Sequence, residues 1–121
     1  NNFPVLKQNT ILKDSLDEMD KFHLGIACIV DDEYRLLGVI TDGDIRRKLS
    51  QVQKPLSSFF VDDSISHAIK EPVVIDENFN TIDALNLMEE KQIWDLPVIN
   101  NGKLVGLLHM HSIAKVLLNN S

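Results

Sequence analysis

A short polar motif, Thr41-Asp42-Gly43-Asp44, carries the most chemistry in this sequence. It follows the apolar run Gly38-Val39-Ile40, so a strand is expected to end at Ile40 and a helix to begin after Thr41. Backbone N–H groups at the start of a helix can hold a phosphate, and the Thr41 hydroxyl could add a donor to a phosphate or ribose oxygen. The Asp44 carboxylate could accept hydrogen bonds from a ribose diol, and Gly43 would let a ligand approach the backbone closely.

The same residues also fit a helix cap without a ligand. Thr41 is a favoured N-cap residue, and Asp44 is placed to accept a backbone N–H as in a capping box. Asp42 and Asp44 suit the positive end of the helix dipole. Arg46 and Arg47 follow and could neutralise an anionic ligand. The spacing leaves both interpretations open.

A second candidate group, His109-Met110-His111-Ser112, stands near the end of the chain. His109 and His111 alternate along the expected end of a strand, so they share a side and could contact a ligand or a metal. No third metal ligand stands at a suitable spacing, and we predict no metal site. This group lacks the hydroxyl and the carboxylate of the first motif, so the two sites are not expected to be equivalent.

Composition excludes several classes of protein. The 121 residues are 44% hydrophobic and 25% charged, with a net charge of −6, which is typical of a soluble globular protein. A net negative chain is a poor partner for nucleic acid. No apolar run is long enough to span a bilayer and no leader opens the chain, so no membrane association is predicted. The single cysteine, Cys28, suits a reducing cytoplasm.

The other conspicuous side chains are expected to be structural. Cys28 should be a buried, inert thiol, and Trp94 should pack, with stacking on a base as its alternative. His67 is interpreted as core or surface filler, and Asp62-Asp63 as a solvated loop. No Ser/His/Asp set, Cys/His set or phosphate-binding glycine loop is present, so no catalytic residue is predicted.

The chain contains the same unit twice. Residues 35–40 match residues 103–108 at a shift of 68, and residues upstream of the first copy's loop match at a shift of 69. Position types agree over some forty residues, which indicates a duplication. Each copy predicts the order β-α-β-β-α, from apolar alternation and helical spacing. The expected elements are 5–6, 12–22, 26–30, 36–40 and 42–49 in the first copy and 73–75, 82–88, 96–99, 104–108 and 111–118 in the second.

The predicted fold class is therefore α+β, with two small mixed sheets covered by helices. We expect repeat 1 at residues 5–50, a packed linker at 51–71 because of Phe59-Phe60, and repeat 2 at 72–118. One unit buries little surface alone, so we expect the two sheets to pack about a pseudo-twofold axis. Such packing would leave two related clefts for ligands.

These motifs resemble a known family. The tandem unit with Leu96-Pro97-Val98-Ile99, Leu104-Val105-Gly106 and the Gly-x-x-Thr-x-x-Asp pattern of residues 38–44 looks like a CBS domain pair, over about residues 5–118. The resemblance implies a regulatory module that binds adenosyl compounds or other nucleotides and often dimerises. It also implies that Thr41 contacts phosphate and Asp44 contacts ribose.

A narrower similarity is to the C-terminal CBS pair of bacterial arabinose 5-phosphate isomerases. It is carried by residues 38–47, by residues 83–88 and, most specifically, by Gly-Leu-Leu-His-Met-His at residues 106–111. Ser112 and the segment 69–72 depart from that family's pattern. The resemblance implies a catalytic sugar-isomerase domain ahead of this segment, in an enzyme that feeds Kdo and lipopolysaccharide synthesis.

The resemblance thus implies no cofactor but an effector such as AMP, ATP or CMP-Kdo, with coupling through a homodimer. The ligand residues would be Thr41, Asp42, Asp44, Arg46 and Arg47 in one cleft and His109 and His111 in the other. Two alternatives remain: a structural dimerisation module without a ligand, and a CBS pair attached to a sugar nucleotidyltransferase.

Overall fold

The computed structural model describes residues 2–110 of the 121. Two compact units divide the chain between Pro72 and Val73, and each is described by itself. Across the described residues, no helix has the length and apolar character needed to cross a membrane. The expected final helix, at about 111–118, lies outside the described residues.

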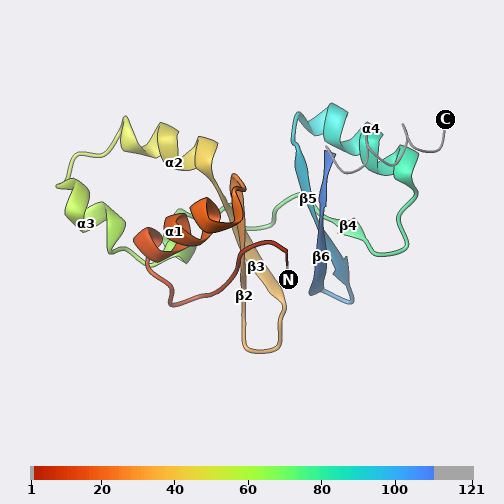
Figure 1. Ribbon diagram of the computed structural model, residues 1–121, viewed down its shortest axis with the longest axis horizontal. Coiled ribbons are helices and arrows are strands. Elements are labelled where there is room, and N and C mark those ends of the chain that lie inside the picture. Colours follow the sequence, from red (N-terminus) through yellow and green to blue (C-terminus); the bar gives the residue numbers. More distant parts are fainter. Residues whose placement is uncertain (1, 111–121) are drawn as a thin grey trace. The chain divides into compact units, whose positions relative to one another are not determined.

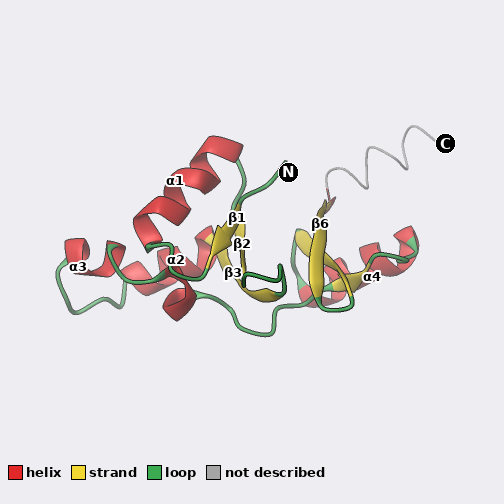
Figure 2. Ribbon diagram, turned by 90° about the horizontal axis from the view of Figure 1, so that it is seen from below, coloured by secondary structure: helices red, strands yellow, loops and turns green. Residues whose placement is uncertain are grey.

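The first unit is a three-stranded mixed sheet with helices on one face (Figures 1 and 2). In the strand order β1-β2-β3, β1 runs parallel to β2, and β2 runs antiparallel to β3. Its elements are β1 (Val5–Lys7), α1 (Leu12–Phe22), β2 (Ile26–Val30), β3 (Leu36–Thr41), α2 (Asp42–Leu49), α3 (Leu56–Phe60) and the 3-10 turn η1 (Ser64–His67).

Apolar spacing explains how this unit closes. All five residues of β2 are buried, and β2 is the middle strand of its sheet. Leu12 and Met19 on α1 and Ile45 on α2 pack with Ile40 of β3 in one core. Cys28 is completely buried, as predicted.

The segment between the two copies packs on the first unit. Phe59 of α3 is buried in the same core, and Ser64 of η1 lies 2.5 Å from Ser15 of α1, hydroxyl to hydroxyl. Ile69 and Val39 exchange two backbone hydrogen bonds, of 2.8 and 3.0 Å. A Cβ on Gly38 would lie 2.9 Å from the carbonyl oxygen of Ile69, so this close approach requires glycine.

The second unit repeats the arrangement with sheet order β4-β5-β6. Asn80 caps the helix α4 (Thr81–Lys91), because its side chain accepts hydrogen bonds from the N–H groups of Ile82 and Asp83. Asn101 (φ 53°) and Gly102 (φ 81°) form the hairpin turn, as their types predict. The elements are β4 (Ile75–Asp76), α4 (Thr81–Lys91), β5 (Asp95–Asn100) and β6 (Lys103–His109).

Hydrogen-bond register confirms the duplication. Ile29 pairs with Gly38 in one sheet and Val98 with Gly106 in the other, which preserves the shifts of 69 and 68. Both antiparallel pairs have their irregularity at the same place, after Ile29 and after Val98. Two expected boundaries were wrong by more than one residue: β4 begins at Ile75 rather than at residue 73, and α4 ends at Lys91 rather than at residue 88.

Candidate functional site

Thr41 ends β3 and caps α2, as its position predicted. Its extended backbone (φ −120°, ψ 147°) turns the chain from strand to helix, and its Oγ1 accepts a 3.3 Å hydrogen bond from the backbone N–H of Asp44. The backbone N–H of Asp42 donates to the carbonyl of Gly25 at 3.0 Å, which ties the start of α2 to the entry of β2. The helix start is therefore held on two sides.

Asp44 does not complete the expected capping box. Its Oδ1 forms an ion pair with Arg47, one turn further along α2. Its Oδ2 is buried and has no hydrogen-bond partner within the part of the chain that the structure describes, although the side chain as a whole is 18% exposed. A buried acceptor without a donor costs about 1–3 kcal/mol, and a hydroxyl or amino group of a ligand would relieve that cost.

Asp42 and Arg46 form the outer edge of the site. Their side chains are 62% and 77% exposed, and the closest charged atoms are 3.8 Å apart. Arg46 and Arg47 thus each face a carboxylate of their own helix, and the four formal charges cancel. An anion that reached either arginine would have to replace one of these carboxylates.

Two glycines lie near this site, and the sequence interpretation noticed only one. A Cβ on Gly43 would meet only the Arg47 guanidinium, at an ordinary 3.8 Å, whereas a Cβ on Gly25 would lie 2.9 Å from the Asp42 carboxylate. A side chain at position 25 would therefore displace the exposed Asp42 carboxylate, whereas position 43 has open space. Gly25 stands directly before the buried run of β2, which was the available signal.

The second candidate group is only partly described. His109 Nδ1 lies 2.6 Å from Asp95 Oδ1, and the two residues are direct partners across β5 and β6. Asp95 was not singled out in the sequence. This carboxylate occupies the position that the apolar Ile26 takes in the first copy, and that difference was the available signal. His111 lies outside the described residues. Within residues 2–110 no group of three potential metal ligands occurs.

One of the expectations for single residues was wrong: Trp94, expected to pack, is 67% exposed. Asp62 lies in a loop, as expected, but its carboxylate is only 27% exposed and accepts hydrogen bonds from Lys54 at 2.7 Å and His67 at 2.8 Å. His67 packs on the buried Phe59, as filler would, and in addition contacts Asp62 and Lys48. The hydrogen bond from Lys54, and then that from His67, lowers the pKa of Asp62 below its ordinary value.

Two copies of one sheet-and-helix unit, with Thr41 and Asp44 where the first copy's last strand meets its helix, define a repeat module. The chain belongs to the CBS-domain family, whose model matches residues 1–51 and 61–119.

The relatives agree with this assignment. Arabinose 5-phosphate isomerase KdsD of Yersinia pestis is 33% identical over 112 residues, which are 93% of this chain. The enzyme of the same name in Escherichia coli is 30% identical over 113 residues. The chain spans about a third, 33%, of the length of these relatives. A crystal structure of CBSX2 in complex with AMP is 27% identical, with a TM-score of 0.85 over 98% of this chain and 90% of that chain.

Proposed function

We propose that this chain is the effector-sensing part of a sugar-phosphate isomerase and that it binds an adenosyl or cytidyl nucleotide at the start of α2. The observation that carries the proposal is the Asp44 carboxylate. Its Oδ2 is a buried acceptor without a partner among residues 2–110, next to a threonine hydroxyl at the N-terminus of a helix. A nucleotide supplies what this arrangement lacks, because its ribose donates hydrogen bonds and its phosphate suits a helix N-terminus.

Each residue has a distinct role in this proposal. Asp44 Oδ2 accepts from a ribose hydroxyl, and Thr41 Oγ1 donates to a phosphate oxygen while it still accepts from the backbone of Asp44. Asp42 pairs with Arg46 at the rim until a phosphate binds that arginine instead. Arg47 pairs with Asp44 and can be bound by a phosphate in the same way. His109 and His111 belong to a second, unlike site in the other copy.

The similarity to KdsD supports the attached enzyme. This chain aligns with a third of each KdsD relative, so the isomerase domain is proposed for the remainder of a longer protein. Arabinose 5-phosphate made by such an enzyme feeds Kdo synthesis, so CMP-Kdo is the end-product effector in this proposal, beside AMP and ATP. The AMP bound to CBSX2 supports the adenosyl alternative. The proposal includes a homodimer in the cytoplasm.

Regulation would be allosteric in this proposal. An effector that binds one arrangement of the dimer more tightly shifts the population toward it, and the catalytic domains respond. Coupling of this kind is typically about 1–3 kcal/mol and is reciprocal, so the sugar phosphate would alter effector affinity by the same factor.

One observation favours a second candidate, a structural dimerisation module. The charges at the start of α2 already pair with one another, Asp42 with Arg46 and Asp44 with Arg47, so the helix carries no excess charge that calls for an anion. In that case the module would hold subunits together whether or not nucleotide is present.

A thermal-shift panel separates the two candidates. AMP, ATP, CMP, CMP-Kdo and arabinose 5-phosphate are added to the chain one at a time. A ligand at one hundred times its Kd adds about 2.7 kcal/mol to the free energy of unfolding, a rise in Tm of several degrees. A rise with one nucleotide supports the sensor. No rise with any of them, together with a dimer by size-exclusion chromatography in every case, would favour the structural module.

A further inference from the structure

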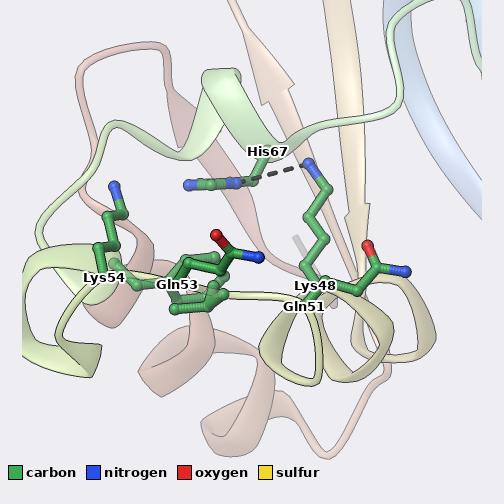
Figure 3. Close-up of a pocket in the computed structure, with 7 residues that line it drawn as sticks. Lys48, Gln51, Gln53, Lys54 and His67 are labelled. Carbon is green, nitrogen blue, oxygen red and sulfur yellow. Dashed lines mark hydrogen bonds between the residues drawn. The ribbon is translucent and has the colours of Figure 1, made fainter.

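The first unit has a cavity at the other end of α2, away from Thr41 and Asp44. It is a shallow depression, open to solvent, with a volume of about 440 Å³ between the last turn of α2, the loop after it, α3 and η1. Figure 3 shows the lysines Lys48 and Lys54 on opposite sides of the His67 ring, with the Gln51 and Gln53 carboxamides nearby. Pockets that bind small molecules have about this volume.

The charged groups around this cavity favour an anion. Its lining includes two lysines and neither aspartate nor glutamate, although the chain carries a net charge of −6. Asp62 pairs with Lys54 and His67. Lys48 has no carboxylate within ion-pair distance among residues 2–110, and its Nζ lies 3.5 Å from His67 Nδ1. Lys48, Lys54 and Asp62 together leave one positive charge in excess.

The geometry also fixes how the donors are presented. His67 Nε2 faces Asp62 Oδ2 at 2.8 Å, and the His67 ring packs on Phe59 with the ring centres 4.6 Å apart. Phe59 is 1% exposed, so it gives the imidazole a rigid support. The ammonium groups extend from separate elements, which lets several oxygens of one anion be bound at once. The carboxamides add neutral donors and acceptors of the kind that bind hydroxyl groups.

We infer that this cavity binds a small phosphate monoester with a hydroxylated body, of the sugar-phosphate class. The phosphate lies between Lys48 and Lys54 at the His67 edge, because a phosphate carries close to two negative charges at neutral pH and lysine binds it as a point charge. Gln51 and Gln53 contact the hydroxyl groups. The site is separate from the start of α2, so it stands whether or not a nucleotide binds there.

The test uses ribose 5-phosphate, inorganic phosphate and ribose, titrated against the chain while the imidazole resonances of His67 are followed by NMR. Ribose 5-phosphate and phosphate are expected to shift these resonances with saturation, and ribose is not. Lys48→Gln and Lys54→Gln should each weaken the binding of ribose 5-phosphate by about tenfold or more, while Lys48→Arg retains binding. Lys103→Gln, an exposed lysine of β6 in the other unit, is the matched control.

Three outcomes would overturn the inference. One is the absence of a saturable shift at His67 with ribose 5-phosphate. Another is a response confined to residues 41–44, which would place the phosphate at the start of α2. The third is equal affinity in Lys48→Gln, Lys54→Gln and Lys103→Gln. If a glutamine variant fails to fold, Gln51→Ala, at an exposed position, tests the same cavity through a weaker contact and should lower affinity for ribose 5-phosphate but not for inorganic phosphate.

Discussion

Asp44 and Arg47 form an ion pair one turn apart on α2, and the pairing occupies only one of the two carboxylate oxygens. The same carboxylate was expected to close a capping box at Thr41. Because it bonds to Arg47 instead, the Thr41 hydroxyl is the one side-chain cap of α2, beside the backbone hydrogen bond from Asp42 to Gly25. The two residues of the motif are therefore predicted to act on different quantities. The stability of the fold should depend on Thr41, and the affinity for a ligand should depend on Asp44.

Replacing Thr41 with valine should destabilise the fold. The variant keeps the shape of the side chain but removes the acceptor for the Asp44 N–H, and a lost cap typically costs about 1 kcal/mol. Thermal unfolding should show a Tm lower by about 3–5 °C. Thr41→Ser keeps the hydroxyl and serves as the control; a serine variant as unstable as the valine variant would show that the hydroxyl is not what holds the helix start.

Gly38→Ala should be much more harmful than Gly106→Ala, although the two glycines occupy matching positions in the two copies. A Cβ at 38 would lie 2.9 Å from the Ile69 carbonyl, whereas a Cβ at 106 would meet only Val98, at 3.8 Å. Overpacking of this kind costs about 1–3 kcal/mol. Urea unfolding of the two variants checks the difference, and similar losses at both positions would contradict the close packing of the linker on β3.

The buried hydroxyl pair of Ser15 and Ser64 should behave as one unit. Ser64→Ala leaves the Ser15 hydroxyl with a single weak contact, 3.4 Å from the carbonyl of Ile11, so we expect a loss of about 1–3 kcal/mol. The double variant Ser15→Ala/Ser64→Ala removes both polar groups and should lose less than the sum of the single variants. A double-mutant cycle from denaturant unfolding measures this coupling, and strict additivity would show that the two hydroxyls do not interact.

Asp62 should make the first unit sensitive to acid. Hydrogen bonds from Lys54 and then His67 lower its pKa below the ordinary value of 3.8. A carboxyl whose pKa is lower in the folded state than in the unfolded state stabilises the fold above the unfolded pKa. This stability is lost as the pH falls from about 4 through the folded pKa.

Asp62→Asn should therefore lower Tm at neutral pH and flatten its dependence on pH below about 4. The neighbouring, exposed Asp63→Asn is the control and should keep the slope of the unsubstituted chain. Thermal melts at several pH values compare the three proteins. An unchanged slope in Asp62→Asn would mean that the network with Lys54 and His67 adds nothing to stability.

Much of the fold follows from local patterns. The buried run at Ile26–Val30, the helix at Leu12–Phe22 and the Asn101-Gly102 turn were all predictable, because apolar spacing and positive φ are properties of a few neighbouring residues. The duplication added the pairing of the strands. The edge strand β4 was placed too early in the sequence. Val73 and Val74 are as apolar as strand residues, and only the pairing with β5 determines that β4 begins at Ile75.

The site was harder to predict where partners come from distant segments. Thr41 was predictable as a cap, because its partner is three residues away. Gly25, which lies close to the Asp42 carboxylate, was indicated only by its place directly before the buried run of β2, and nothing in the sequence indicated the network that joins Lys54 to Asp62 and His67. Those contacts depend on how the loop after α2 returns to η1, which no local periodicity describes.

Isothermal titration of AMP and of CMP-Kdo into the chain and into Asp44→Asn tests the central claim most directly. We expect at least one of the two nucleotides to bind, and Asp44→Asn to weaken it by about tenfold or more. Asp83→Asn, which changes an aspartate in the first turn of α4, should leave the affinity within about twofold. Equal affinity in the unsubstituted chain and in Asp44→Asn, or no binding of either nucleotide, would contradict the claim that the start of α2 is a nucleotide site.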